Sequence, residues 1–382
     1  MKKIKVMSIF GTRPEAIKMA PLIKELETRE EIDSIVCVTA QHREMLDQVL
    51  NTFSIKPDYD LNIMKKGQTL SEITARVLRG IEEVLEKEKP NIVLVHGDTT
   101  TTFASALAAF YQQISIGHVE AGLRTYNKYS PFPEEMNRQM VDCLTDMYFA
   151  PTNLSKENLV KEGISAEKIY ITGNTVIDAM SKTVDSNYKN EILDWVGNDR
   201  LILLTAHRRE NLGENMYSIF NAVNKIVNEF DDVKVIYPMH LNSKVREIAQ
   251  EVLGNNAKVK LIEPLEVFDF HNFQNKAYLI LSDSGGVQEE APSLGKPVIV
   301  LRDTTERPEG IEAGTLVLAG TEEENIYKIT KNLLEDENKY KAMSKAVNPY
   351  GDGKASERIV QAIQHYFGLT EAVSEFKEGD EA

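Results

Sequence analysis

Three carboxylates, Asp98, Glu120 and Glu134, occupy positions from which they could exchange protons with a bound molecule. Asp98 follows the apolar run IVLVH, Glu120 follows ISIGHV, and Glu134 opens a helical stretch after Pro-Phe-Pro. If the two runs are neighbouring strands of a parallel sheet, Asp98 and Glu120 share one rim, where open sheets bind ligands. Simpler roles exist, because Asp98 can cap the next helix and Glu134 suits a helix dipole. We favour acid–base chemistry, since the three carboxylates gather with Arg13 nearby.

Cationic side chains near the start predict a contact with a phosphate or a carboxylate. The first apolar run ends in Gly-Thr-Arg13-Pro-Glu, and Lys18 lies one turn into the helix that the proline favours. The alternative is a capped helix with solvated charges. The chain contains neither GxGxxG nor GxxxxGK[ST], so neither a nicotinamide cofactor nor a Walker-type NTPase is indicated. The 7 histidines show no ligand spacing such as HExxH, so no metal site is expected.

The second half of the chain carries a stronger candidate for binding an anion. Ser284, Gly285 and Gly286 follow an apolar run and open a helix, whose free N–H groups and positive dipole suit a diphosphate. Glu290 lies one turn further, where a carboxylate could accept hydrogen bonds from ribose hydroxyls. A plain glycine-containing loop is the alternative.

Two more polar stretches follow apolar runs of the second half. His207-Arg208-Arg209 follows LILLTA, and the mixed charges of residues 302–309 follow PVIVL. His207 could be a core histidine, but two adjacent arginines at a strand end favour a ligand.

Short β-branched runs alternate with helix-length amphipathic segments along nearly the whole chain, which predicts doubly wound parallel α/β sheets. Expected strands of the first half are 4–10, 34–39, 91–96, 114–119 and 147–150. Those of the second half are 201–206, 233–237, 258–262, 277–282, 297–301 and 315–318. Expected helices include 68–89, 100–111, 214–230 and 286–294.

The alternation breaks between residues 174 and 200, which predicts a division between two domains that face each other across a cleft. We expect an N-terminal domain over residues 1–174 with the acid–base carboxylates, and a C-terminal domain over 175–352 with the anion cradle. Residues 353–370 are expected to form a helix that crosses back to the first domain, and the acidic tail 371–382 to fray.

The composition limits the class of protein. Of the 382 residues, 42% are hydrophobic and 27% charged, as in an ordinary globular protein with two domains. A net charge of −15 argues against nucleic acid or an anionic membrane as a partner. No apolar run is long enough to span a bilayer and no signal peptide is recognised, so we expect a cytoplasmic protein. Cys37 and Cys143 are expected to be buried thiols.

Motifs distributed along the chain carry a resemblance to a known family. In order they are GTRPEAIKMAP, HGDTTTTFA, HVEAGLRT, PFPEEMNR, TAHRREN, LSDSGGVQEEAPSLGKP and RDTTERPEG. Together they closely resemble the non-hydrolysing UDP-N-acetylglucosamine (UDP-GlcNAc) 2-epimerases of bacteria, over about residues 3–367.

The resemblance implies two Rossmann-like domains in the GT-B arrangement, a homodimer, and interconversion of UDP-GlcNAc and UDP-N-acetylmannosamine (UDP-ManNAc) without a cofactor. Carbon 2 of the sugar is not next to a carbonyl. The family therefore eliminates UDP to leave 2-acetamidoglucal, and adds UDP back with protonation from the opposite face. UDP stays bound throughout, and the ManNAc supplies a cell-envelope polysaccharide.

The resemblance also implies residue roles. Asp98, Glu120 and Glu134 become acid–base groups, while Arg13 and His207 become essential groups near the reacting centre and the phosphates. The implied substrate contacts are Lys18, Phe270, Ser284, Gly285, Gly286, Glu290 and Arg307.

Many bacterial members bind UDP-GlcNAc as an activator in a second site. Gln41 and His42 resemble that site, with Arg208 and His240 as partners. Where a further glutamine and an arginine are expected, this chain has Glu44 and Gly67.

Three other functions share part of the pattern. A hydrolysing 2-epimerase releases UDP and free ManNAc, and a GT-B glycosyltransferase depends on an acceptor. A non-catalytic nucleotide-sugar sensor needs the diphosphate cradle but not the carboxylates. The presence of Asp98, Glu120, Glu134 and His207 therefore argues against the sensor.

Overall fold

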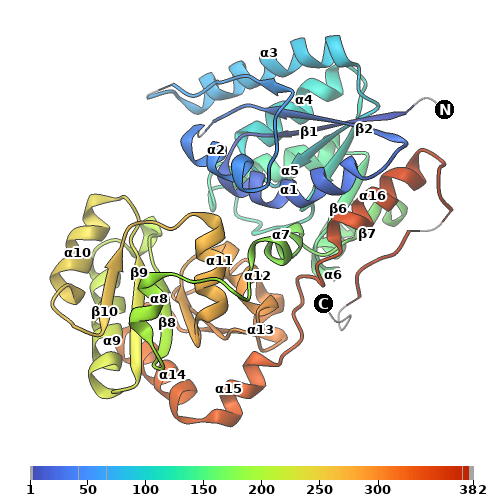
Figure 1. Ribbon diagram of the computed structural model, residues 1–382. Helices are drawn as coiled ribbons and strands as arrows, with labels where there is room; N and C mark the ends of the chain where they lie inside the picture. Colours follow the sequence, from blue (N-terminus) through green and yellow to red (C-terminus); the bar gives the residue numbers. More distant parts are fainter. Residues whose placement is uncertain (1–2, 42, 66, 372, 378–382) are drawn as a thin grey trace. The chain divides into compact units, whose positions relative to one another are not determined.

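The computed structural model describes residues 3–41, 43–65, 67–371 and 373–377. The chain forms two compact units, Met1–Ala179 with Tyr350–Ala382, and Met180–Pro349. Each unit contains one parallel sheet with helices, so the expected two-domain α/β, Rossmann-like fold is confirmed (Figure 1).

The division between the units falls inside helix α7 (Thr175–Thr183) rather than at its start near residue 175. In the first half of this helix, Asp178 accepts hydrogen bonds from the N–H groups of Ala355 (3.1 Å) and Ser356 (2.7 Å) in the first unit. At its end, Thr183 hydrogen-bonds His271 of the second unit at 2.6 Å. A continuous helix shows no polar linker in the sequence, and the boundary was therefore misplaced by a few residues.

The first unit has a sheet of seven parallel strands in the order β3-β2-β1-β4-β5-β6-β7. The order in which successive strands are added to the sheet reverses between β1 and β4. The strands are β1 (Ile4–Phe10), β2 (Ile32–Val38), β3 (Tyr59–Asp60), β4 (Ile92–His96), β5 (Ser115–Val119), β6 (Met147–Ala150) and β7 (Ile169–Ile171). Only β3 and β7 were not expected. Both are edge strands of two or three residues, too short to show a β pattern.

Helices cover both faces of this sheet. On one side α1 packs against α2 and α16, and on the other α4 packs between α3 and α5 (Figure 1). The helices are α1 (Arg13–Glu27), α2 (Arg43–Thr52), α3 (Leu70–Glu88), α4 (Thr100–Tyr111), α5 (Glu134–Leu144), α6 (Asn153–Lys161) and α16 (Ala355–Tyr366), with a 3-10 turn η1 (Ala166–Lys168). With both faces covered, β4 is buried at every residue, as its unbroken apolar run predicts.

The second unit repeats the design with six parallel strands in the order β10-β9-β8-β11-β12-β13. They are β8 (Arg200–Thr205), β9 (Val233–Pro238), β10 (Val259–Ile262), β11 (Leu279–Ser282), β12 (Val298–Val300) and β13 (Leu316–Leu318). The helices are α8 (Glu191–Val196), α9 (Glu214–Glu229), α10 (Ser243–Leu253), α11 (Val267–Lys276), α12 (Gly285–Ser293), α13 (Pro308–Glu312), α14 (Glu323–Glu335) and α15 (Glu337–Ser344), with a 3-10 turn η2 (Arg209–Asn211). All six strands were expected.

The two cysteines differ in burial. Cys37 lies in β2, and burial raises the pKa of its thiol to about 12. Cys143 is exposed, so the expectation that both are buried was wrong. In α5 the buried positions include Arg138, Val141 and Asp142, and Cys143 points away from that face.

The described residues contain no helix that combines the length and the apolar composition of a membrane span.

The segment 373–377 of the expected acidic tail is docked on the first unit, contrary to the expectation that it frays, while residues 372 and 378–382 of that tail lie outside the described residues. Phe376 is only 2% exposed, and its N–H donates to the carbonyl of Ile171 at 2.8 Å. The Arg358 guanidinium lies over its ring, 5.6 Å from the centroid, and Glu375 pairs with Lys156 at 3.2 Å. The acidic composition of the tail did not indicate that one aromatic residue, Phe376, anchors it.

We predict that Phe376→Ala lowers the free energy of unfolding of the first unit by about 3 kcal/mol, because it empties a buried aromatic site. Leu369→Ala, at a side chain that is 45% exposed, is the matched control and should change it by less than about 0.5 kcal/mol. Urea unfolding measures both. Equal stability of the two variants would show that the docked segment contributes nothing.

Candidate active site

The first unit contains a cavity of about 700 Å³ at the carboxyl ends of β1, β4 and β5. This is the place where an open parallel sheet binds ligands, next to the reversal of strand order. Six predicted site residues line it together: Arg13, Lys18, Gln41, Asp98, Glu120 and Glu134. The three carboxylates therefore gather at one edge of the sheet with Arg13 nearby, as the sequence predicts, while their chemical roles stay predictions.

Glu120 is held in an unusual backbone conformation directly after β5. Its φ of +67° lies in the left-handed region, which costs free energy for a residue with a side chain. Its carboxylate forms an ion pair with Lys18, and Oε1 accepts a hydrogen bond from Asn174 Nδ2 at 3.0 Å. The loop thus aims Glu120 at the cavity while Lys18 and Asn174 fix its orientation.

Asn174 was not expected at the site. Its own Oδ1 accepts from the N–H of Val176 at 3.0 Å, and its N–H donates to Tyr350 O at 2.7 Å. The amide is thereby locked with Nδ2 facing Glu120. Asn174 lies in the loop that follows the edge strand β7, and this strand is too short to be recognised in the sequence.

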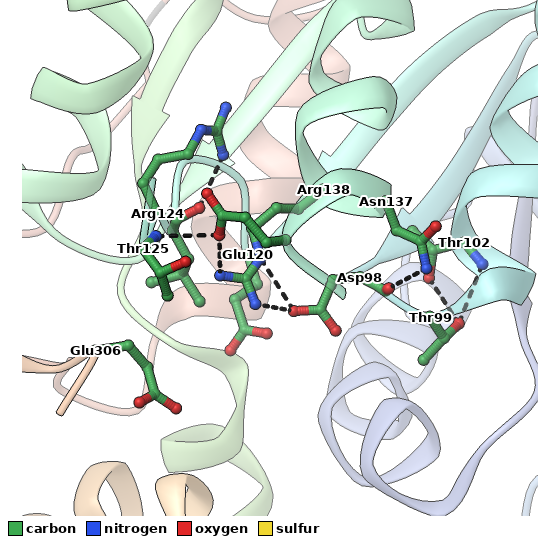
Figure 2. A network of polar contacts seen from close by, with 12 residues as sticks. Asp98, Thr99, Thr102, Glu120, Arg124, Thr125, Asn137, Arg138 and Glu306 are labelled. Carbon is green, nitrogen blue, oxygen red and sulfur yellow. Dashed lines mark hydrogen bonds and ion pairs between the residues drawn. The ribbon is translucent and has the colours of Figure 1, made fainter. Parts of the chain in front are cut away.

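Asp98 does not cap helix α4. Thr99 is the N-cap, and its hydroxyl accepts from the N–H of Thr102 at 3.1 Å. The Asp98 carboxylate instead accepts from Arg138 at 2.5 Å, while its carbonyl accepts from Asn137 at 2.9 Å (Figure 2). The simpler role considered for Asp98 is therefore wrong, and its carboxylate lies at the cavity wall.

Glu134 is the first residue of α5, where the positive end of the helix dipole favours a carboxylate. Its neighbour Glu135 is fully buried and fixes the preceding loop, because it accepts from the N–H groups of Thr125 and Tyr126 at 3.0 Å each. Glu135 also pairs with Arg138 at 3.0 Å. Adjacent glutamates therefore have different tasks, one facing the cavity and the other supporting its wall.

A buried ionic network behind the cavity holds the loop that carries Asp98. His118 Nε2 lies 2.7 Å from the carbonyl of Gly97, and its Nδ1 lies 2.7 Å from Asp142. Arg124 contacts the other oxygen of Asp142 at 2.6 Å. Burial favours the neutral form of Asp142, but His118 and Arg124 keep its pKa below the usual range. Sequence reasoning missed these three residues as supports of the site.

Glu15 is a second buried support. Its Oε2 accepts from the N–H groups of Gly11 (3.0 Å) and Thr12 (2.7 Å), and its Oε1 accepts from the hydroxyls of Thr99 (2.7 Å) and Thr102 (3.0 Å). Burial raises the pKa of Glu15 despite these four donors. The spacing Thr-x-x-Glu at residues 12–15 is a capping-box signal that could have identified it.

In the second unit, Asp283 holds the loop that follows β8. This fully buried carboxylate accepts from the N–H groups of His207 and Arg208 at 2.8 Å each, and from Asn211 at 3.0 Å. The His207 ring stacks on His240 with 5.2 Å between centroids. Burial lowers the pKa of His207, and the Asp283 carboxylate opposes this only in part.

The expected anion cradle of the second unit lies at the start of α12. Ser284 is the N-cap, and the helix begins at Gly285 and Gly286, which leaves backbone N–H groups at its first turn. Arg307 lies so close that a Cβ on Gly285 would be 2.7 Å from Nη1. Glu290, one turn along, accepts from Gln274 at 2.6 Å. These predicted residues are therefore neighbours in the structure.

The remaining predicted residues belong to both units. Gln41 lines the cavity of the first unit, whereas His42 lies outside the described residues. Arg208 lies 3.8 Å from Glu306, and the Glu306 pKa is held at about 2 because Arg307 and Arg302 outweigh the effect of its burial. Phe270 is partly buried against the core of the second unit.

The buried His96 predicts a specific dependence of stability on pH. Burial lowers its pKa to about 3, even though Glu120 attracts a proton to it. In the unfolded chain His96 has an ordinary histidine pKa near ~6.5. As the pH falls from about 6.5 towards 3, the unfolded chain therefore binds a proton that native His96 does not bind, and the free energy of unfolding decreases over that pH range. Between pH 6.5 and 4.5, wild type should lose about 2–3 kcal/mol more unfolding free energy than His96→Gln. Urea unfolding at several pH values measures this, and an equal loss of unfolding free energy in the two proteins over this pH range would contradict the prediction.

The sequence profile described as UDP-N-acetylglucosamine 2-epimerase matches residues 24–364. The UDP-N-acetylglucosamine 2-epimerase of Bacillus subtilis is 65% identical over 368 residues, which are 96% of this chain and 97% of that protein.

Two solved structures are also similar over nearly the whole chain. The S. aureus MnaA–UDP structure is 58% identical with a TM-score of 0.92, covering 99% of this chain and 100% of that one. The Neisseria meningitidis UDP-GlcNAc 2-epimerase bound to UDP-GlcNAc is 51% identical with a TM-score of 0.89, covering 95% and 100%. Matches of this length and identity show that the chain belongs to the UDP-N-acetylglucosamine 2-epimerase family.

Proposed function

We propose that the protein is a non-hydrolysing isomerase that converts UDP-GlcNAc reversibly into UDP-ManNAc at carbon 2 of the sugar. The observation that carries the proposal is the set of three carboxylates, Asp98, Glu120 and Glu134, around one cavity with Arg13 and Lys18. Carboxylates can also bind sugar hydroxyls, but three of them beside two cations in one cavity supply the proton acceptor and proton donor that epimerisation needs.

The reaction proceeds by elimination and re-addition. One carboxylate accepts the proton from carbon 2 as the bond between carbon 1 and the UDP oxygen breaks, which leaves 2-acetamidoglucal and UDP. Protonation of carbon 2 from the opposite face, with return of the UDP oxygen to carbon 1, gives the other epimer. Carboxylates on different strands and helices suit this chemistry, because base and acid must act from different sides. Arg13 and Lys18 stabilise the negative charge that develops on the leaving diphosphate.

The second unit binds the UDP moiety in this proposal. The first turn of α12 at Ser284, Gly285 and Gly286 offers N–H groups to the diphosphate, and Arg307 adds a positive charge beside it. Glu290 contacts the ribose, Phe270 contributes to the nucleotide site, and His207 acts near the phosphates. The S. aureus relative was solved with UDP and the N. meningitidis relative bound to UDP-GlcNAc, which supports this class of ligand.

Regulation and assembly follow the family pattern in the same proposal. UDP-GlcNAc also acts as an activator through Gln41, His42, Arg208 and His240, with Glu44 and Gly67 modifying its strength. The enzyme works as a cytoplasmic homodimer without a cofactor, and its product supplies ManNAc to a cell-envelope polysaccharide.

The decisive experiment is proton NMR of the purified protein with UDP-GlcNAc in heavy water. Wild type should form UDP-ManNAc with deuterium at carbon 2. Asp98→Asn, Glu120→Gln and Glu134→Gln should each lower kcat by about 10²–10⁴, because each removes an acid–base group. Glu86→Gln, at an exposed glutamate of α3, is the control and should leave kcat unchanged.

Other products would redirect the assignment. Free ManNAc with UDP would place the enzyme with the hydrolysing epimerases. Near-normal turnover in all three carboxylate variants would overturn the acid–base roles. Absence of carbon 2 exchange in the wild type, with UDP-GlcNAc bound, would favour a sensor or an acceptor-dependent transferase.

The diphosphate cradle has a separate test. We predict that Gly285→Ala weakens UDP binding at least about tenfold, or about 1.4 kcal/mol, because the new Cβ would lie 2.7 Å from Arg307 Nη1 and displace the guanidinium. Lys328→Ala, at a lysine whose side chain is 69% exposed on α14, should bind UDP as wild type does. Isothermal titration calorimetry measures both. If Gly285→Ala bound UDP with the affinity of wild type, Arg307 and the start of α12 would not belong to the UDP site.

A further inference from the structure

His96 is the last residue of β4 and forms part of the wall of the cavity in the first unit. Its side chain is only 4% exposed. Within the described part of the chain, its Nε2 atom is buried and has no hydrogen-bond partner. Native proteins satisfy nearly all buried polar atoms, so an exception at a cavity wall points to a function.

The unpaired nitrogen faces one particular group. His96 Nε2 lies 3.7 Å from Oε2 of Glu120, while Oε1 of the same carboxylate accepts from Asn174 and pairs with Lys18. Glu120 also has the left-handed φ of +67°. Two features that cost free energy therefore occur in neighbouring residues: an unsatisfied imidazole nitrogen in His96 and a left-handed backbone at Glu120.

The charge state of His96 suits a hydrogen-bond donor rather than a proton carrier. The pKa of His96 is lowered to about 3: burial is the largest cause, Glu120 opposes it, and Lys18 and His118 act in the same direction as burial. The imidazole is therefore neutral at physiological pH and holds a single N–H. A neutral donor can bind a carboxylate without giving up its proton to it.

We propose that His96 is a positioning residue whose Nε2–H donates to Oε2 of Glu120 when substrate occupies the cavity. Hydrogen bonds at acid–base sites are often long without ligand and tighten in the complex, and a shift of about 0.5–1 Å closes this one. With Oε1 held by Lys18 and Asn174, the contact fixes the plane of the carboxylate and favours its ionised form.

The consequence for catalysis rests on the proposed epimerase function. A fixed, ionised Glu120 presents Oε2 to carbon 2 of the sugar. His96 does not touch the reacting atoms in this account. It acts through Glu120, and its loss should lower kcat rather than raise KM.

Three substitutions separate this role from packing. The amide nitrogen of glutamine can reach the position of His Nε2, that of asparagine reaches only the position of Nδ1, and leucine offers no donor. We expect His96→Asn and His96→Leu to lower kcat about 30- to 300-fold with KM and the Kd for UDP within about threefold of wild type. His96→Gln should retain at least about a third of wild-type kcat. Thermal unfolding of each variant identifies any that fail to fold.

A spectroscopic test is independent of turnover. ¹⁵N NMR of histidine-labelled protein, with His96 assigned from His96→Gln, should show the Nε2–H tautomer and no titration between pH 5.5 and 9. Adding UDP-GlcNAc should shift the Nε2–H proton downfield in wild type by at least about 1 ppm, and Glu120→Gln should abolish that shift.

The outcomes distinguish this proposal from the proposed function. An Nδ1–H tautomer, equal losses in the glutamine and asparagine variants, or wild-type kcat in His96→Asn would overturn the role of His96. If wild type performs no epimerisation, the function fails, whereas the tautomer and its response to Glu120→Gln still test the contact.

Discussion

The buried carboxylate of Glu15 links the two loops on which the cavity of the first unit depends. It accepts from backbone N–H groups after β1 and from threonine hydroxyls after β4, the neighbouring strands at the reversal of strand order. An unpaired carboxylate would be costly in this position, so the donors must stay in place around it. The backbone that carries Arg13 and Lys18 is thereby held against the backbone that carries Asp98.

The second unit solves the same problem with a different residue. Its loop after β8 is held by Asp283, which follows the neighbouring strand β11 and accepts from the N–H groups of His207 and Arg208. In both units a buried acceptor ties together the ends of two adjacent parallel strands. This arrangement explains how polar loops at the open edge of each sheet keep a defined geometry, although loops are usually the most mobile parts of a fold.

Two local features around Glu120 cost free energy, and the contacts that surround them offset this cost. The left-handed backbone of Glu120 and the unpaired His96 nitrogen are individually unfavourable, while Asn174, Lys18 and the buried His118–Asp142–Arg124 network surround them with satisfied contacts. Strain that is confined to one carboxylate and enclosed by a rigid shell is typical of a site whose geometry serves a reaction rather than stability.

The class of fold, the strands long enough to show an apolar run, and the residue types at the strand ends can be read from the amino-acid sequence, because burial on both faces and turn chemistry leave local patterns. These patterns pointed to Asp98, Glu120, Glu134 and the loop at Gly285. The partner of each side chain became known from the three-dimensional fold: Thr99 rather than Asp98 caps α4, Phe376 anchors a segment with the composition of an acidic tail, and Asn174 and His96 face Glu120. Those contacts join residues far apart in the chain, so their free energies depend on packing and leave no periodic signal in the sequence.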